Sequence, residues 1–498
     1  MKNTKAILAL LLIFTLVASL TVTANAAPAD LSGHQYTAYQ IFAGSQEEAT
    51  TDGSLARIDW GTGISGDAFL AALKASTAFG SPNPFRTART AADVATIMSE
   101  SQLFVDNSAA SDAFSKLAYQ YKVGDGQPCE NGVTPLPAGY YLVVDTTEFA
   151  DNATNTVRNL ALLQLTGKGT FAINNKASVP TVEKKVKDNN DTAGTLSDWQ
   201  DSADYDIGDV VPFQVTVTLG EMRGYDTYAV KVWDTLCAGL TYQGPVTVTH
   251  NGNDVTDYFT SGIATNQDGT TSLTVECDNV KDFAAAGETI VFTYSAVLNE
   301  NAVIGPAGND NTVYLEYSNN PNDASEKGKT PPDLVRVFTY LLHLNKVDQD
   351  AQPLAGAEFT LYKLVGNDYV AWNGNKSVGV ANAAGTEFDW TGLDDGQYKL
   401  VETRTPDGYN TAADILFTVT AGHDVVSDNP QLNSLNGTAP VTGELSTGTL
   451  SVDVENEGGV VLPETGSEGT HMIYMLGSAL LLGGLILIVT RKRVGDAA

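Results

Sequence analysis

More than half of the sequence is a succession of short segments with strand character. From about residue 179 to residue 457 the segments alternate in polarity or are rich in β-branched residues, and Gly, Asn and Asp separate them. Short strands with regular turn signals are typical of immunoglobulin-like β-sandwiches, so the pattern predicts a mainly β protein built from tandem sandwiches. The candidate strands are 211–219, 246–249, 272–276, 289–298, 311–317, 341–346, 358–363, 398–402 and 415–419.

The region before these strands has a different pattern. Residues 67–74 and 91–101 have helical spacing, whereas 139–145 and 160–165 read as strands. We therefore expect an N-terminal domain of mixed structure over residues 30–175.

The boundary between the two sandwiches is marked by composition. The stretch 327–333 contains two prolines and lies between two strand-rich regions. It predicts a hinge, with one sandwich over residues 178–331 and the next over 336–457.

The first residues have the pattern of a secretory signal. Lys2 and Lys5 precede an apolar run over 6–20, and the small residues of Ala24-Asn25-Ala26 follow. This order predicts a signal peptide over residues 1–26, cleaved after Ala26. The alternative is a membrane anchor, but the apolar run is short for a spanning helix.

The last residues combine three elements in a fixed order. The motif is Leu462-Pro463-Glu464-Thr465-Gly466. An apolar stretch over 472–490 is long enough to cross a bilayer as one helix, and the tail 491–498 begins with three basic residues. Together they resemble the cell-wall sorting signal read by sortases, which implies cleavage after Thr465 and its transfer to an amine. The alternative is a single-pass protein with an accidental motif.

Composition narrows the classes of function. A net charge of -31 argues against nucleic acid as a partner and favours a soluble surface protein. The three cysteines, at positions 129, 237 and 277, are too few for a disulfide framework. A Cys237–Cys277 bridge is compatible with the sequence, although buried thiols are favoured.

Signs of an active site or a metal site are missing from the sequence. The five histidines do not cluster at metal-ligand spacing, and residues 188–191 lack the remaining EF-hand positions. No GxSxG, HExxH or phosphate loop occurs. We expect no metal, no cofactor and no enzyme activity on other molecules.

The last sandwich carries polar residues on faces that should be buried. Successive side chains of a strand point to opposite faces. Lys346 therefore shares a face with Leu344, and Glu402 shares one with Tyr398 and Leu400. By the same rule Asn456 shares a face with Val452 and Val454.

A lysine, a carboxyl group and an asparagine buried together suggest a reaction. A buried charged pair does not reliably recover its desolvation cost, whereas burial lowers the pKa of a lysine and raises that of a carboxyl group. A neutral amine could attack the carboxamide and release ammonia, giving a Lys–Asn isopeptide bond. Two other interpretations remain at this point, a satisfied buried ion pair and a strand that faces water.

Motifs of the same region resemble a known domain. The LNKVD…PLAGAEFTLYK opening, the YKLVETRTPDGY segment and the VDVEN ending are similar to the Cna-B-type domain of Gram-positive pilins, whose YxLxETxAPxGY element is called the E-box. The resemblance implies that Lys346 and Asn456 are bonded and that Glu402 is the catalyst. Thr405 replaces the usual alanine, a difference that we do not expect to affect the chemistry.

The middle sandwich has a similar set of residues. Val182, Lys184 and Val186 share a face, so Lys184 is the inward lysine. The stretch resembles the isopeptide-forming second domain of fimbrial shaft proteins, which implies Asp234 as the acid and Asn311 as the amide. Asn319 has the same parity as Asn311 and is its rival, and the alternative interpretation is a solvated lysine beside an unconnected acid.

The N-terminal region resembles the N-terminal pilin domain through the sequence YTAYQIF over 36–42. Asp145 follows a strand as Glu402 does, but the candidate first strand, 34–42, has no lysine. We therefore expect no cross-link there.

A polymerising pilin also needs an exposed nucleophile. Lys176 lies at the boundary of the first two regions, where shaft pilins have a YPK-type lysine, although Asn174-Asn175 stands in place of Tyr-Pro. Joining Thr465 of one subunit to Lys176 of the next would make a head-to-tail filament.

The sequence thus predicts a secreted, cell-wall-anchored shaft subunit of a pilus that supports adhesion. Its expected partners are a sortase, other copies of itself, accessory pilins, peptidoglycan and a host-surface receptor. The alternatives are an accessory pilin at the tip or base, a monomeric wall-anchored adhesin, and a wall-anchored enzyme on a β-rich stalk.

Overall fold

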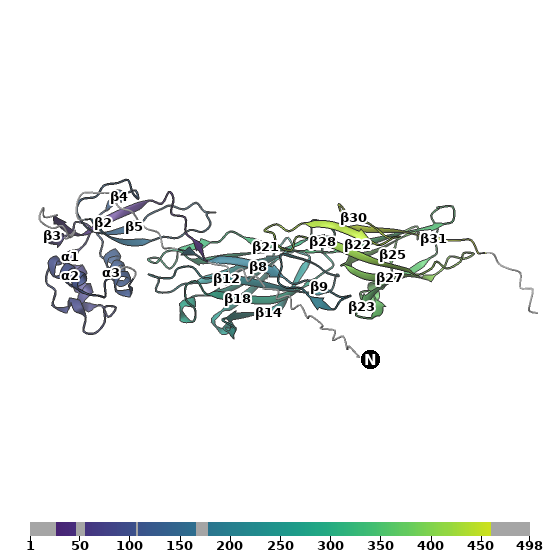
Figure 1. Cartoon of the computed structure of the whole chain (residues 1–498), viewed down its shortest axis with the longest axis horizontal. Coiled ribbons are helices and arrows are strands. Elements are labelled where there is room, and N and C mark those ends of the chain that lie inside the picture. The colour runs from purple at the N-terminus through teal and green to yellow at the C-terminus, as the bar shows by residue number, and fades with distance from the viewer. Residues whose placement is uncertain (1–25, 46–54, 106–107, 166–177, 460–498) are drawn as a thin grey trace, which may run out of the picture.

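The computed structural model describes residues 26–45, 55–105, 108–165 and 178–459. Nearly all of the predicted signal peptide, Lys176, the 462–466 motif, the apolar stretch 472–490 and the basic tail lie outside these ranges. Within them, no helix is both long and apolar enough to cross a bilayer. Figure 1 shows three domains end to end along the long axis of the molecule, and the prediction of a mainly β chain with a mixed N-terminal domain is confirmed.

The first domain packs helices against one face of an antiparallel sheet. The strands, in the order β3-β2-β5-β6 with β4 beside β2, are β2 (Tyr36–Ser45), β3 (Ala56–Trp60), β4 (Gln127–Cys129), β5 (Gly139–Asp145) and β6 (Leu160–Leu165). The helices are α1 (Gly66–Ala75), η1 (Pro84–Thr87), α2 (Ala91–Glu100) and α3 (Ala109–Gln120). Phe69, Phe85 and Phe114 fill the space between the helices and the sheet.

One helix of this domain was not predicted from the sequence. Helix α3 buries Ala110, Phe114 and Ala118, which recur every fourth residue as an amphipathic helix requires. Ser108 begins it, because its side chain accepts a hydrogen bond from the amide of Ser111.

The second domain is a sandwich of two sheets. One sheet, in the order β15-β14-β18-β12-β8, contains β8 (Thr181–Val186), β12 (Val210–Thr218), β14 (Leu240–His250), β15 (Asn253–Asp254) and β18 (Thr289–Leu298). The other, in the order β11-β21-β19-β13-β17-β16 with β20 beside β19, contains β11 (Ser202–Asp204), β13 (Val230–Leu236), β16 (Thr260–Thr265), β17 (Thr271–Cys277), β19 (Asn309–Ser318), β20 (Lys327–Lys329) and β21 (Asp333–Phe338). Short elements complete it, namely β9 (Asn189–Asn190), β10 (Thr195–Leu196), η2 (Thr256–Tyr258) and η3 (Val280–Asp282). Strands β12 and β18 alternate between buried and partly exposed residues, which is why their apolar side chains meet in the core.

The second domain extends beyond the predicted limits at both ends. Strand β1 (Ala27–Pro28) pairs with β7 (Ser178–Val179), and Ala29 joins the core of this domain. In the sequence, the first domain therefore lies between two segments that both belong to the second domain. At the other end, the stretch predicted as a hinge contains β20 and leads into β21, whose Val335 and Val337 are core residues, so the connection to the third domain falls at Thr339.

The third domain is a sandwich in which the first and last strands lie side by side. One sheet, in the order β25-β26-β22-β31-β30, contains β22 (Tyr340–Asp348), β25 (Val380–Ala381), β26 (Glu387–Leu393), β30 (Thr442–Glu444) and β31 (Thr449–Asn456). The other, in the order β24-β23-β27-β28-β29, contains β23 (Glu358–Val365), β24 (Asp368–Ala371), β27 (Gly396–Arg404), β28 (Ile415–His423) and β29 (Leu432–Gly437), and η4 (Gly374–Ser377) is a short turn of helix. Strands β22 and β31 pair in parallel, with Leu344 opposite Val452.

The three cysteines are free. Cys277 ends β17 opposite Val230, at the start of β13, whereas Cys237 follows the far end of that strand. The Cys237–Cys277 bridge is therefore not formed, because the two residues lie at opposite ends of β13.

Candidate cross-linking sites

The third domain buries the three residues predicted to react. Lys346 on β22 and Asn456 on β31 are buried, as is Glu402 on β27 across the sandwich. Asn456 donates a hydrogen bond from Nδ2 to Oε2 of Glu402 at 2.9 Å. The ammonium group of Lys346 donates to the main-chain oxygens of Val347, at 2.7 Å, and Val454, at 3.1 Å.

The same oxygen of Glu402 accepts further hydrogen bonds. The amide of Ala412 donates to Oε2 at 2.7 Å, and the hydroxyl of Thr405 donates to it at 3.3 Å. The structure therefore brings Thr405, the departure from the family pattern, into contact with the candidate catalyst. The other oxygen, Oε1, and Oδ1 of Asn456 are buried and have no hydrogen-bond partner.

Burial shifts Lys346 toward the neutral amine. Burial lowers the pKa of Lys346, and the negative charge of Glu402 opposes this effect without cancelling it. A lysine that loses its proton more easily is a better nucleophile.

The second domain brings its three predicted residues together around a fourth. Lys184 on β8 contacts Oδ2 of Asp234 on β13, and both lie in the core. Asn311 on β19 is also buried, but its amide nitrogen donates to the hydroxyl of Tyr294, at 2.7 Å. That hydroxyl donates to Oδ2 of Asp234 at 2.8 Å and accepts from Lys184 Nζ at 2.8 Å.

The pKa values of this pair shift toward the neutral forms. Burial lowers the pKa of Lys184 and raises that of Asp234, while the attraction between the two opposes both shifts. Oδ1 of Asp234 and Oδ1 of Asn311 are buried without a hydrogen-bond partner. A buried carboxylate oxygen without a donor is costly, and a proton on Oδ1 of Asp234 would reduce that cost.

Asn319, the alternative to Asn311, lies outside the group around Lys184. Asn319 is buried, and its Nδ2 donates to the hydroxyl of Thr156 in the segment that follows the first domain's β5, at 3.0 Å. Of the two asparagines, the structure places Asn311 in the group around Lys184.

The first domain has an acid at the corresponding position but a different partner. Asp145 lies 2.6 Å from Nδ1 of His34 and accepts from the hydroxyl of Thr147 at 2.6 Å. Its carboxylate is thus held by an imidazole and a hydroxyl group.

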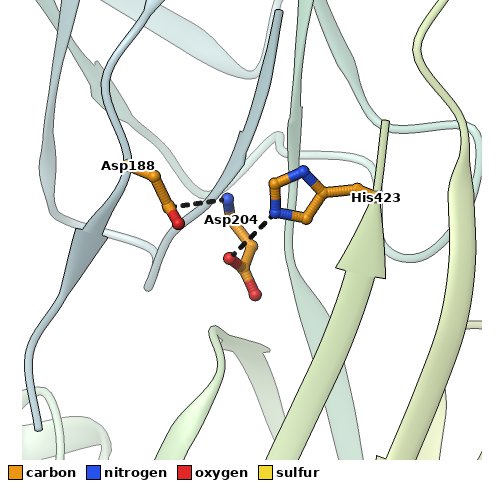
Figure 2. Close-up of side chains that lie close together, drawn as sticks. All are labelled: Asp188, Asp204 and His423. Carbon is orange, nitrogen blue, oxygen red and sulfur yellow. Dashed lines mark hydrogen bonds and ion pairs between the residues drawn. The ribbon is translucent and has the colours of Figure 1, made fainter. Parts of the chain in front are cut away.

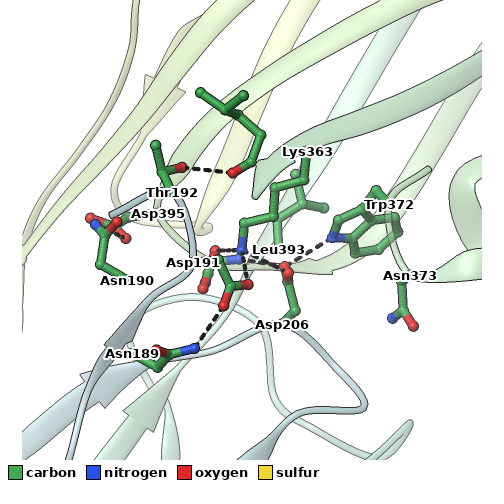
Figure 3. A network of polar contacts seen from close by, with 12 residues as sticks. Asn189, Asn190, Asp191, Thr192, Asp206, Lys363, Trp372, Asn373, Leu393 and Asp395 are labelled. Carbon is green, nitrogen blue, oxygen red and sulfur yellow. Dashed lines mark hydrogen bonds and ion pairs between the residues drawn. The ribbon is translucent and has the colours of Figure 1, made fainter. Parts of the chain in front are cut away.

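A third buried lysine joins the second and third domains, and sequence reasoning missed it. Lys363 on β23 lies 2.8 Å from Asp191 and 2.8 Å from Asp206, both of the second domain (Figure 3). It also contacts Asp394 of its own domain. Trp372 donates from Nε1 to Asp206 at 2.9 Å. The signal was present, because Lys363 shares a face of β23 with two core residues, Phe359 and Leu361.

The surroundings of Lys363 keep it charged. Burial alone would lower its pKa, but Asp394, Asp206 and Asp191 together raise it above the usual value. Oxygens of these three carboxylates and of Asp209 lie within 4.8 Å of one another, and the ammonium group is the cation that binds among them. Lys363 is therefore an ionic contact between domains.

A histidine pairs with carboxylates at the same interface. His423 of β28 lies 3.6 Å from Asp204 of β11, whose main-chain amide donates to Asp188 at 3.2 Å (Figure 2). Burial raises the pKa of Asp188 to about 7. Burial alone would lower the pKa of His423, but the negative charge of Asp204 raises it above the usual value. The pair lies across the boundary between the second and third domains.

Comparisons with known proteins identify two of the three domains. Residues 207–321 match the family described as "Gram-positive pilin backbone subunit 2, Cna-B-like domain", and residues 341–431 match the SpaA family, "prealbumin-like fold domain". The chain is 26% identical to the trypsin-resistant surface T6 protein of Streptococcus pyogenes serotype M6, over 64% of this chain and 70% of that protein.

Solved structures of pilins are also similar. The T6 backbone pilin of Streptococcus pyogenes matches 87% of this chain and 98% of its own, with 17% identity and a TM-score of 0.49. The major pilin SpaA of Corynebacterium diphtheriae matches 85% of this chain and 95% of its own, with 15% identity and a TM-score of 0.43. The second domain is therefore similar to a Gram-positive pilin backbone Cna-B-like domain over residues 207–321, and the third is similar to a SpaA-type prealbumin-like domain over residues 341–431.

Proposed function

We propose that this chain is the shaft subunit of a sortase-polymerised, wall-anchored pilus, and that Lys–Asn isopeptide bonds formed by the chain itself stabilise its second and third domains. The observation that carries the proposal is a buried lysine beside a buried acid and a buried asparagine in each of these domains. Pilin-domain matches over both domains support the same conclusion.

The reaction conserves atoms without a cofactor. The neutral amine of Lys346 attacks the carboxamide carbon of Asn456, a new C–N bond forms, and the old bond to Nδ2 breaks. Glu402 takes the excess proton that the new bond leaves on Nζ of Lys346 and gives a proton to Nδ2, with which it is hydrogen-bonded, so the leaving nitrogen departs as ammonia. In the second domain Lys184 is the attacking amine, Asn311 is the amide and Asp234 is the acid, although Nδ2 of Asn311 donates to the hydroxyl of Tyr294 rather than to the acid.

Polymerisation would use the two ends of the same subunit. A sortase cleaves after Thr465 and joins it to Lys176 of the next subunit, and the final subunit is joined to peptidoglycan. In the sequence, Lys176 lies two residues before Ser178, where β7 opens the longer of the two segments that form the second domain. A contact between two different surfaces does not close on itself, so it yields a filament.

Intact mass tests the cross-links. The mature chain, residues 27–465, should be lighter than its sequence by two ammonia molecules, and Lys184→Met and Lys346→Met should each recover one. An unmodified mass in the wild-type chain would rule out the isopeptide chemistry.

A polymer assay separates the shaft from its alternatives. Cells that express the wild-type chain should yield a ladder of covalent multimers in denaturing gels, and Lys176→Arg should abolish it. A monomeric adhesin would show no ladder in the wild type, and an accessory pilin would appear in multimers only with another subunit as the repeating unit.

A further inference from the structure

Tyr294 occupies the centre of the second-domain site. Its hydroxyl oxygen lies 2.8 Å from Nζ of Lys184 and 2.7 Å from Nδ2 of Asn311. These are the nitrogen that would attack and the nitrogen that would leave. The same hydroxyl donates to Asp234 at 2.8 Å.

The two candidate sites differ at this point. In the third domain the leaving nitrogen of Asn456 donates directly to the carboxylate of Glu402, at 2.9 Å. In the second domain the hydrogen bond of Asn311 goes to the tyrosine, which in turn bonds to Asp234. Aspartate is one methylene shorter than glutamate, and the phenol group spans the distance that the shorter acid leaves.

We propose that Tyr294 is a catalytic residue of the second domain, and that its hydroxyl group passes a proton from the attacking amine of Lys184 to the leaving nitrogen of Asn311. This inference rests on the proposed isopeptide bond. It adds a fourth residue to the lysine, acid and amide.

The proton transfer balances without a net change in the tyrosine. When Nζ of Lys184 bonds to the carboxamide carbon of Asn311, the new C–N bond leaves an excess proton on Nζ. The Tyr294 oxygen accepts that proton, directly or through Asp234, and gives its own proton to Nδ2. The C–Nδ2 bond then breaks, ammonia departs, and both Tyr294 and Asp234 recover their starting forms.

The strand holds the hydroxyl group in place. Tyr294 lies on β18 directly opposite Phe213 of β12, and the two rings stack with centroids 5.6 Å apart. Nζ of Lys184 lies 5.2 Å from the centroid of the tyrosine ring and 5.5 Å from that of Phe213. Burial keeps the phenol neutral by raising its pKa well above the usual value, so the group can donate and accept at once.

The test uses the full mature chain with Tyr294→Phe, synthesised in a cell-free system and sampled over time. Mass spectrometry of digested samples measures the Lys184–Asn311 and Lys346–Asn456 cross-linked peptides separately. We expect the first peptide to form more slowly by about 10²–10⁴-fold, the usual effect of a positioned proton-transfer group. The second should form at the wild-type rate, which also reports that the third domain has folded.

Two further variants separate chemistry from packing. Tyr242→Phe is the matched control, because the ring of Tyr242 lies 5.8 Å from that of Tyr294 and its hydroxyl is absent from the proton path. Replacing Tyr294 with 3,5-difluorotyrosine retains the ring and the hydroxyl but changes its acidity, so the pH dependence of the rate should shift. A purely structural role would leave that pH dependence unchanged.

The outcomes distinguish the role of Tyr294 from the proposed Lys184–Asn311 bond on which it depends. Wild-type formation of the Lys184–Asn311 peptide with equal rates in Tyr294→Phe would overturn the role of Tyr294 alone. A wild-type chain without that peptide would overturn both the second-domain cross-link and the role of the tyrosine.

Discussion

Removing the acid of the third domain should reveal how much the cross-link stabilises it. Glu402→Ala leaves Lys346 and Asn456 in place but takes away the carboxylate that contacts the amide nitrogen. The bond would close a loop of about 110 residues, and constraining an unfolded loop of that length is worth about 5 kcal/mol in the chain-entropy treatment. For a domain of this size, that corresponds to a fall of about 20 °C in melting temperature.

Calorimetry of the mature chain measures this effect, with intact mass recorded on the same samples. Glu402→Ala should lose one ammonia molecule fewer than the wild-type chain, and its third domain should melt about 20 °C lower. The melting temperature of the second domain should not change. Asn456→Ala is the matched control, since it removes the electrophile and leaves the acid. An unchanged mass deficit in Glu402→Ala would show that Glu402 is the wrong acid, and a lost bond with an unchanged melting temperature would refute the loop argument.

Other expected outcomes follow from the remaining sites. Asn311→Ala should abolish the second-domain mass loss, whereas Asn319→Ala should retain it, as peptide mapping can check. Lys363→Met leaves three carboxylates without their cation and should destabilise the junction of the second and third domains by about 3–5 kcal/mol, seen as faster proteolysis at Thr339. Burial and the charge of Asp206 raise the pKa of Asp209 to about 7. The protonated carboxyl group therefore contributes fully to the free energy of unfolding below the ordinary pKa of aspartate, and this contribution is lost as the pH rises through 7. The temperature at which the contact between the second and third domains melts should therefore fall as the pH is raised from about 5 to about 8, and a higher melting temperature at pH 8 would contradict this prediction.

Alternation along single strands was enough to predict which lysines point inward. Lys184 and Lys346 are both fully buried, and each was assigned from the apolar residues two positions away. The rule works because a strand side chain has only two faces to choose from. The same rule holds for Lys363, although that lysine was not singled out from the sequence. Its ion-pair partners Asp191 and Asp206 come from a different domain, so no pattern within the strand indicates them.

The role assigned to Tyr294 had no sequence signal. An inward tyrosine on a strand is an ordinary core residue, and only the convergence of β8, β13, β18 and β19 shows that its hydroxyl forms hydrogen bonds with all three residues of the proposed site. The domain boundary predicted at the proline-containing stretch 327–333 also depended on strand pairing that a local sequence pattern does not show. Its prolines lie between β20 and β21, and both strands pair with β19, so a local turn there was read as the end of the domain.

The parallel pairing of β22 and β31 has a mechanical consequence. Tension along a filament would enter the third domain at the start of β22 and leave it after the end of β31, so it would shear the two strands against each other. Lys346 and Asn456 lie near the ends of these strands, and a bond between them would pass the force directly from one to the other. Residues 347–455 would then carry no tension, and the domain could not lengthen under a pull that unfolds an ordinary sandwich.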